Sequence, residues 1–204
     1  MIQGAGIVEC DVTFTKDRQL ICRHDQCDLY TTTCTRPEMN AKCTTPWTAG
    51  GSAKCCASDF TLAEIKTFCA KMDSAASGAM TAEAYIGGVA GFRTTMYEYE
   101  CPEVPTHKES IALMMDFGGK FTPELKTPAV TMPYEGDYTQ EDYAQQMIDE
   151  YIEAGVDPSA VWPQSFLWED AIYWVQNTDF KQAVALEGNY DAYYFSESEF
   201  AACC

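Results

Sequence analysis

Positive charge is scarce in this sequence. Its 204 residues include 13 Lys and Arg against 31 Asp and Glu, which gives a formal net charge of −18 at neutral pH. A surface this acidic repels the phosphates of nucleic acids and the headgroups of anionic lipids. We therefore expect no nucleic-acid partner, whereas a bound divalent cation would offset part of the repulsion among the carboxylates.

Long hydrophobic runs are absent as well. No stretch of about 18 consecutive apolar residues occurs, so we expect no transmembrane segment. The sequence does not open with a basic segment followed by an apolar one, which is the pattern of a signal peptide, so we expect a mature form or a fragment. No G-x-G-x-x-G motif is present, and its absence argues against a dinucleotide-binding fold.

Histidine is scarce, whereas cysteine is abundant. The two histidines, His24 and His107, and the lack of any C-x-x-C pair disfavour a zinc site. The 11 cysteines instead favour disulfides formed in an oxidising compartment, so we predict an extracytoplasmic protein, secreted or periplasmic. The odd number leaves at least one thiol unpaired, and the terminal pair Cys203–Cys204 is the first candidate.

Strand-like and helix-like segments alternate along the chain. Strands are predicted at 7–14, 19–22, 120–126, 160–165 and 182–186, and helices at 62–72, 107–117, 140–153 and 168–176. This alternation predicts a parallel sheet with right-handed crossovers, in an α/β fold of the (β/α)8 TIM-barrel type. Only about five strands fit, so we expect an incomplete barrel, about strands two to six, within one domain over residues 1–204.

Two long segments have no helical or strand-like period. Residues 26–59 are rich in Cys and Thr, and we predict a long loop pinned by disulfides. Residues 73–103 form a second irregular excursion. Loops of this length are usually functional, so we expect these two to shape a substrate pocket.

Acidic side chains fall on the barrel-interior side of two predicted strands. In residues 7–14 the apolar alternation points Val8 and Val12 toward the helices, which turns Glu9 and Asp11 inward. The same alternation turns Glu124 and Lys126 inward together. Carboxylates crowded in a poorly solvated interior need a metal, a basic partner or a raised pKa. Three carboxylates and a lysine can form a Mg²⁺ or Ca²⁺ site for an anionic substrate. Solvated surface acids are the other interpretation.

Motifs in order along the chain resemble those of the glycerophosphodiester phosphodiesterase family. They are Glu9-Cys10-Asp11, Thr15-Lys16-Asp17, His24-Asp25, Asp28-Leu29 with Thr31-Thr32-Thr33, Val104-Pro105-Thr106 with Glu109, Pro123-Glu124-Leu125-Lys126 and Gln164-Ser165-Phe166. Each motif is weak alone, but together they cover nearly the whole chain in the family's order.

The resemblance implies a TIM-barrel hydrolase that splits glycerophosphodiesters into an alcohol and glycerol 3-phosphate. The carboxylates matching Glu9, Asp11 and Glu124 would hold a divalent cation, Mg²⁺ or Ca²⁺. The histidine matching His24 would be one of an acid/base pair, and the lysine matching Lys126 would lie near the phosphate.

One departure from the family concerns the second histidine. The family opens with a strand that ends in His-Arg, and no such motif stands before Glu9 here; the last barrel strands also have no counterpart. We therefore expect this chain to be a poor catalyst by itself, because one acid/base group contributes about 10²- to 10⁴-fold in rate. The alternatives are a non-catalytic barrel that binds a metal or a phosphodiester, and a secreted disulfide scaffold.

Overall fold

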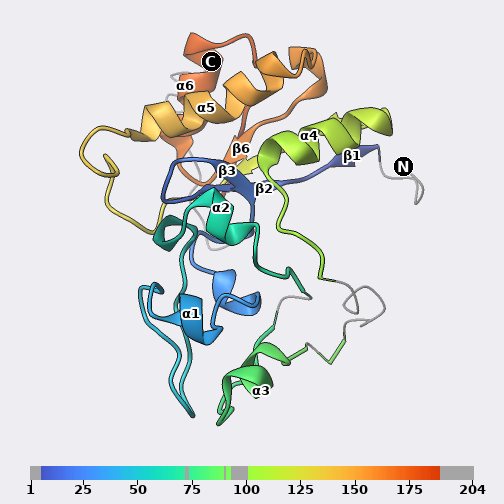
Figure 1. The fold of residues 1–204 in the computed structure, drawn as a ribbon. Helices are drawn as coiled ribbons and strands as arrows, with labels where there is room; N and C mark the ends of the chain where they lie inside the picture. Colours follow the sequence, from blue (N-terminus) through green and yellow to red (C-terminus); the bar gives the residue numbers. More distant parts are fainter. Residues whose placement is uncertain (1–5, 72–73, 90, 93–100, 189–204) are drawn as a thin grey trace.

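The computed structural model describes residues 6–71, 74–89, 91–92 and 101–188 (Figure 1). The elements along the chain are β1 (Ile7–Val8), β2 (Asp11–Phe14), β3 (Leu20–Cys22), η1 (Leu29–Thr31), α1 (Pro37–Asn40), η2 (Ala57–Asp59), α2 (Leu62–Ile65), α3 (Ala82–Ile86), α4 (His107–Asp116), β4 (Lys120–Phe121), β5 (Glu124–Leu125), α5 (Gln140–Glu153), η3 (Pro158–Ala160), β6 (Gln164–Ser165), α6 (Trp168–Asn177) and β7 (Val184–Ala185).

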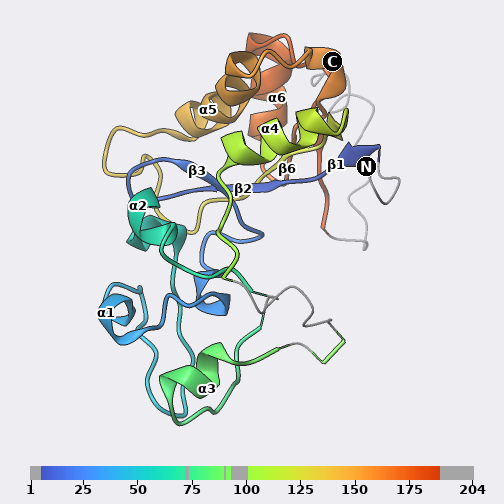
Figure 2. The same cartoon turned by 45° about the vertical axis from the view of Figure 1, so that its right-hand side comes forward.

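The elements form two regions. The sheet region comprises residues 6–22 and 104–188, and the cysteine-rich region is the described part of residues 23–103. In both Figure 1 and Figure 2 the sheet region, with α5 and α6, lies at the top, and the cysteine-rich region, with α1 and α3, lies at the bottom. The strands therefore lie between the long helices and the cysteine-rich region.

Parallel pairing dominates the sheet. Five strands pair in the order β3-β2-β5-β6-β7, and the pairs β2–β5, β5–β6 and β6–β7 are parallel. β1 pairs in parallel with β4 just before β2 and β5. Helix α5 connects β5 to β6, and α6 connects β6 to β7, which is the strand–helix alternation predicted from the sequence.

β3 departs from the predicted parallel arrangement. It pairs with β2 in antiparallel orientation, with Val12 opposite Cys22. Only residues 15–19 separate the two strands, and a parallel connection needs a dozen residues or more. The short polar turn therefore forces a hairpin, and Arg18 within it takes a positive φ of 58°. The prediction of an all-parallel sheet is wrong for this strand.

The helices of the sheet region cover one face with a continuous core. α5 begins at a reciprocal cap, in which Thr139 Oγ1 accepts from the backbone N–H of Asp142 at 3.0 Å and Asp142 Oδ2 accepts from that of Thr139 at 2.9 Å. Its buried residues are Tyr143, Ala144, Met147, Ile148, Glu150 and Tyr151. Gly155 follows its end with a positive φ of 71°. The helix has the bounds predicted from the sequence.

Disulfides hold the cysteine-rich region together. The bonds are Cys10–Cys22 across the β2–β3 hairpin, and Cys27–Cys56, Cys43–Cys55 and Cys69–Cys101 in the cysteine-rich region. The prediction of disulfides is confirmed. Among the described cysteines, Cys34 is the free thiol, and it is buried. Cys203 and Cys204 lie outside the described residues.

Two predictions for the cysteine-rich region need correction. The helix predicted over 62–72 ends at Ile65, and Met72 lies outside the described residues. The backbone N–H of Ala70 bonds to the carbonyl of Pro102 at 2.7 Å, beside the Cys69–Cys101 disulfide, so that part of the segment is held extended against a distant one. The excursion over 73–103 was predicted to be irregular, but it contains the short helix α3, capped by Thr81.

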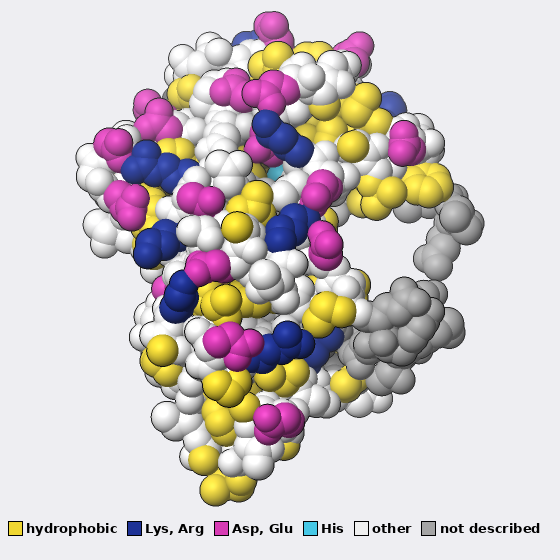
Figure 3. Space-filling model, viewed as in Figure 1, with side chains coloured by type: hydrophobic (Ala, Val, Ile, Leu, Met, Phe, Trp, Pro, Cys, Tyr) yellow, Lys and Arg dark blue, Asp and Glu magenta, His cyan; other side chains and the backbone are white. Residues whose placement is uncertain are grey.

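Hydrogen bonds from backbone N–H groups to side-chain oxygens join the two regions. The backbone N–H of Leu62 donates to Asp17 Oδ1 at 2.8 Å, and that of Ala129 donates to Gln26 Oε1 at 2.7 Å. On the face in Figure 3, acidic side chains are spread over both regions with basic side chains among them. Within the described residues, no helix has both the length and the apolar character needed to span a bilayer.

Candidate metal and substrate site

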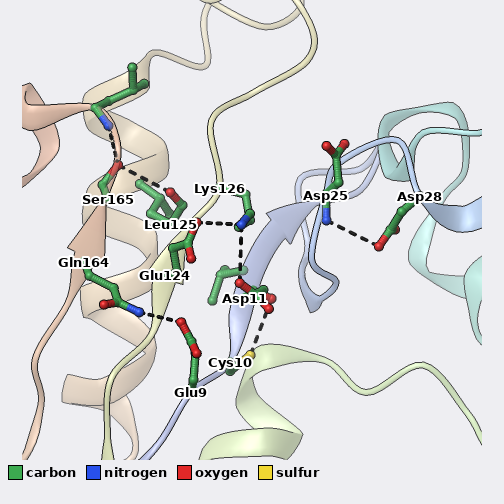
Figure 4. A network of polar contacts seen from close by, with 12 residues as sticks. Glu9, Cys10, Asp11, Asp25, Asp28, Glu124, Leu125, Lys126, Gln164 and Ser165 are labelled. Carbon is green, nitrogen blue, oxygen red and sulfur yellow. Dashed lines mark hydrogen bonds and ion pairs between the residues drawn. The ribbon is translucent and has the colours of Figure 1, made fainter. Parts of the chain in front are cut away.

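Three carboxylates converge where β2 and β5 lie side by side. Glu9 precedes β2, Asp11 begins it, and Glu124 begins β5; the register places Asp11 directly opposite Glu124. One carboxylate oxygen from each residue lies within 4.8 Å of the other two. The structure therefore brings together the three acids that the sequence selected as candidate metal ligands (Figure 4).

Lys126 reaches into the same cluster. Its Nζ donates to Glu124 Oε1 at 2.6 Å and lies 3.5 Å from Asp11 Oδ1 (Figure 4). Both contacts come from the strand alternation, which puts Glu124 and Lys126 on one side of the chain as it leaves β5. The ammonium therefore offsets part of the charge of the acids.

Gln164 is a member of the site that strand reasoning did not select. It begins β6, pairs in register with Glu124, and donates from Nε2 to Glu9 Oε1 at 2.6 Å (Figure 4). Gln164 stood in one of the sequence motifs, but only the sheet register shows that its side chain orients Glu9. The amide thus holds in place the most exposed of the three acids.

The charges in the cluster do not balance. Burial raises the pKa of Glu9, and the neighbouring charges of Asp11 and Glu124 raise it further. Burial by itself lowers the pKa of Lys126, but the hydrogen bond to Glu124 and the charges of Glu124 and Asp11 outweigh it, so the pKa is raised. One ammonium faces three carboxylates, so the donor set has negative charge in excess and suits a hard divalent cation.

The segment after β3 is fixed to β2 and carries His24. The backbone N–H of Arg23 donates to the carbonyl of Asp11 at 2.9 Å, and the buried guanidinium of Arg23 pairs with Asp28 Oδ1 at 2.9 Å. His24 itself is exposed and lines a cavity of about 570 Å³ in the cysteine-rich region. Arg23, which sequence reasoning did not select, therefore positions the backbone beside His24.

The second histidine lies elsewhere. His107, at the start of α4, is fully buried, and its Nδ1 is 2.8 Å from Glu150 Oε2 on α5. Its ring packs edge-on against Tyr151. This pair joins two helices of the core, whereas His24 lines the cavity and follows Arg23, whose backbone is bonded to Asp11.

Solved structures share this fold. A protein from Silicibacter pomeroyi described as a glycerophosphoryl diester phosphodiesterase matches with a TM-score of 0.63 and 16% identity, over 99% of this chain and 63% of that one. A phosphodiesterase from Oleispira antarctica in complex with the product sn-glycerol-3-phosphate matches with a TM-score of 0.57 and 16% identity, over 99% of this chain and 62% of that one. The fold is thus the α/β TIM-barrel type, represented here by a partial sheet.

The sequence identifies the family. Residues 1–194 match the model of the glycerophosphoryl diester phosphodiesterase family, and the chain belongs to that family. A curated relative named "Extracellular protein", from Arthroderma benhamiae, is 42% identical over 122 residues, which is 59% of this chain and 50% of the relative. The chain thus spans about half the length of the curated relative that it matches.

Proposed function

We propose that this protein hydrolyses glycerophosphodiesters to an alcohol and glycerol 3-phosphate, with Mg²⁺ or Ca²⁺ held by Glu9, Asp11 and Glu124. The observation that supports this most strongly is the convergence of those three carboxylates within 4.8 Å at the β2–β5 pair. Family membership and the product-bound relative support the substrate class. Residues 1–204 would form one partial barrel domain, with 26–59 and 73–103 as its loop insertions.

The donor set fits a hard cation. Carboxylate oxygens are the preferred ligands of Mg²⁺ and Ca²⁺. Burial, and then the charges of Asp11 and Glu124, raise the pKa of Glu9, so a nearby cation would stabilise its ionised form. A bound cation would polarise the phosphoryl oxygens and acidify a coordinated hydroxyl or water. Gln164 would keep the Glu9 carboxylate oriented toward the other two acids.

Lys126 and His24 would act on the substrate directly. The Lys126 ammonium, already 2.6 Å from Glu124, would contact a phosphate oxygen from beside the cation ligands. The exposed His24 imidazole would give a proton to the departing alkoxide as a general acid. The four disulfides and the relative named as an extracellular protein support an extracellular setting.

Two measurements test the assignment. Calorimetric titration with Ca²⁺ and Mg²⁺ should show binding that Glu124→Gln abolishes and that Glu38→Gln, a change at an exposed acid of α1, leaves intact. A coupled assay for glycerol 3-phosphate should show turnover, slow in this chain by itself because only one histidine of the acid/base pair has a counterpart in it. The turnover should stop with a chelator and fall about 10²- to 10⁴-fold in His24→Ala.

Contrary results would separate the alternatives. Full activity in His24→Ala would refute its role as the acid. Metal binding that survives Glu124→Gln would refute the metal site, and binding without turnover would favour the non-catalytic barrel. An absence of metal binding would favour surface acids on a disulfide scaffold.

A further inference from the structure

We propose that the cavity beside His24 receives the alcohol part of the substrate and selects neutral polyols over cationic amino alcohols. This inference rests on the proposed function, because it takes His24 as the group that protonates the departing alcohol. The cavity lies within the cysteine-rich region, between the segment that follows β3 and residues 52–53, 74–77 and 85, and its volume is about 570 Å³. That volume is within the range of about 300–1,000 Å³ that is typical of small-molecule sites.

Hydroxyl groups dominate the wall of the cavity. Six lining residues carry one: Tyr30, Thr31, Ser52, Ser74, Ser77 and Tyr85. A hydroxyl both donates and accepts hydrogen bonds, as does each hydroxyl of a polyol. The hydroxyls of Thr31 and Tyr85 already bond to Arg23 and to the backbone of Ala53, so the hydroxyls offered to a polyol are those of Tyr30, Ser52, Ser74 and Ser77.

The negative charge of Asp28 in the cavity wall is already compensated by Arg23. Asp28 is the one carboxylate among the described lining residues, and its Oδ1 pairs with the buried Arg23 guanidinium at 2.9 Å. Its Oδ2 accepts from the backbone N–H of Asp25 at 3.3 Å. A cationic headgroup would therefore meet a carboxylate whose charge Arg23 has compensated.

The buried ring of Tyr85 offers no open face to a cation either. Tyr85 is 1% exposed, its hydroxyl accepts from the backbone N–H of Ala53 at 3.1 Å, and its ring packs on Trp47 with centroids 5.5 Å apart. Recognition of quaternary ammonium groups requires open aromatic faces. A quaternary ammonium would also displace water from the hydroxyls without donating a hydrogen bond in return.

The wall is rigid where it meets the disulfides. Ala53, which lines the cavity, is two residues before Cys55, and Cys55 bonds to Cys43. Thr31 Oγ1 accepts from the Arg23 guanidinium at 2.7 Å on the opposite side. A wall fixed in this way holds its hydroxyls in place before the ligand arrives, which lowers the entropic cost of binding.

The cavity can be filled without disturbing the core. Ser52 and Ser77 line it and are exposed, so Ser52→Trp and Ser77→Trp should fold and block it. Ser159→Trp is the matched control, because Ser159 is an exposed serine of η3 outside the cavity lining. Saturation-transfer NMR with free myo-inositol, glycerol and choline then reports binding without any need for turnover.

The expected result is a signal from myo-inositol and glycerol, with little from choline. Both cavity variants should lose the polyol signal, and Ser159→Trp should retain it. In the glycerol 3-phosphate assay, kcat/KM should be about 10-fold or more higher for glycerophosphoinositol than for glycerophosphocholine, since a site built for hydrogen bonds rejects ligands that lack them. The cavity variants should abolish this preference.

Each contrary result has a defined meaning. Choline binding equal to that of the polyols, or polyol binding that survives both cavity variants, would overturn the inference. Equal turnover of both substrates, still dependent on Glu124, would overturn the inference and leave the proposed function intact. Polyol binding in the cavity without hydrolysis of any substrate would overturn the proposed function and leave the selectivity of the cavity standing.

Discussion

The sheet region and the cysteine-rich region bury comparable kinds of side chains but hold them by different means. In the sheet region, α4, α5 and α6 have 10, 14 and 10 residues, and their apolar faces pack on the strands. In the cysteine-rich region, α1, α2 and α3 have only 4, 4 and 5 residues. Its core, which includes Leu29, Phe60, Phe68 and Tyr85, is closed by disulfides.

The difference follows from how each core is assembled. A helix of ten or more residues presents a whole stripe of side chains, so burial of the stripe stabilises the helix as well. Each short turn presents only one or two side chains to the core, so burial stabilises it little. The disulfides add stability because they limit the conformational entropy of the unfolded chain. The candidate site draws on both regions: its metal ligands lie in the sheet region, and most of its cavity lies in the cysteine-rich region.

The largest effect is expected from a core residue of the sheet region. Trp174 on α6 is fully buried, and its indole N–H donates to the carbonyl of Ala144 at 3.0 Å. Trp174→Ala should lower the free energy of unfolding by about 3–5 kcal/mol, because it leaves a cavity and removes the hydrogen bond to Ala144. Urea unfolding followed by circular dichroism measures this.

Its control is Ile152→Ala, at a residue of α5 that is 57% exposed. That change should stay within about 0.5 kcal/mol of the unaltered protein. Equal losses in the two variants would mean that helix packing does not hold the sheet region together.

The second-largest loss of stability is expected from removing a disulfide of the cysteine-rich region. Replacing both Cys43 and Cys55 by Ser should cost about 2–4 kcal/mol, because it removes a cross-link. Hydrogen exchange should accelerate in residues 26–59 and remain slow in α5. Both cysteines must be replaced, because the sulfur of Cys34 lies within 4.8 Å of theirs and could pair with a single remaining thiol.

Cys34→Ala provides the matched control, since it removes a buried thiol and leaves the disulfide in place. It should cost less than the double replacement. If hydrogen exchange accelerates as much in α5 as in residues 26–59, the two regions unfold as one unit. The proposed difference in what stabilises them would then be wrong.

The smallest effect is a dependence on pH confined to the sheet region. Asp170 on α6 is 2% exposed, and burial raises its pKa from 3.8 to about 6, although Gln140 and Ser165 donate hydrogen bonds to it. Between pH 3.8 and about 6 the folded protein holds a proton that the unfolded chain releases. The contribution of Asp170 to stability is therefore greatest below pH 3.8 and declines as the pH rises through about 6.

Asp170→Asn should remove this decline. The slope that disappears approaches about 1.4 kcal/mol per pH unit, the value for one proton. Unfolding by urea at several pH values between 3.5 and about 7 measures it. An unchanged slope in the variant would show that another group causes the dependence, and Glu38→Gln, a change at an exposed acid of α1, should leave the slope intact.

Sequence reasoning succeeded where the signal is local. The bounds of α5 follow from the Thr139 cap, the apolar stripe and Gly155, which all lie within residues 139–155. Sequence reasoning failed where contacts between residues far apart in the sequence decide the local structure. The 62–72 helix stops at Ile65 because the chain beyond it joins residues 101–102, and no periodicity in the sequence reports that contact.

The candidate site shows the same division. Strand alternation selected Glu9, Asp11, Glu124 and Lys126 because a period of two is a property of one strand. Gln164 and Arg23 were not selected, because their contacts with Glu9 and Asp28 depend on sheet register and on the fold of the loop after β3.

The sequence alone determined the family, the α/β class and the use of cysteines as disulfides, since these follow from composition, motif order and local periodicity. Tertiary structure alone decided which cysteines pair, which thiol stays free, that β3 turns back on β2, and that a hydroxyl-lined cavity opens beside His24. The physical reason is distance along the chain: these features join residues tens of positions apart, and only the packing of the whole chain chooses among the partners that the sequence permits.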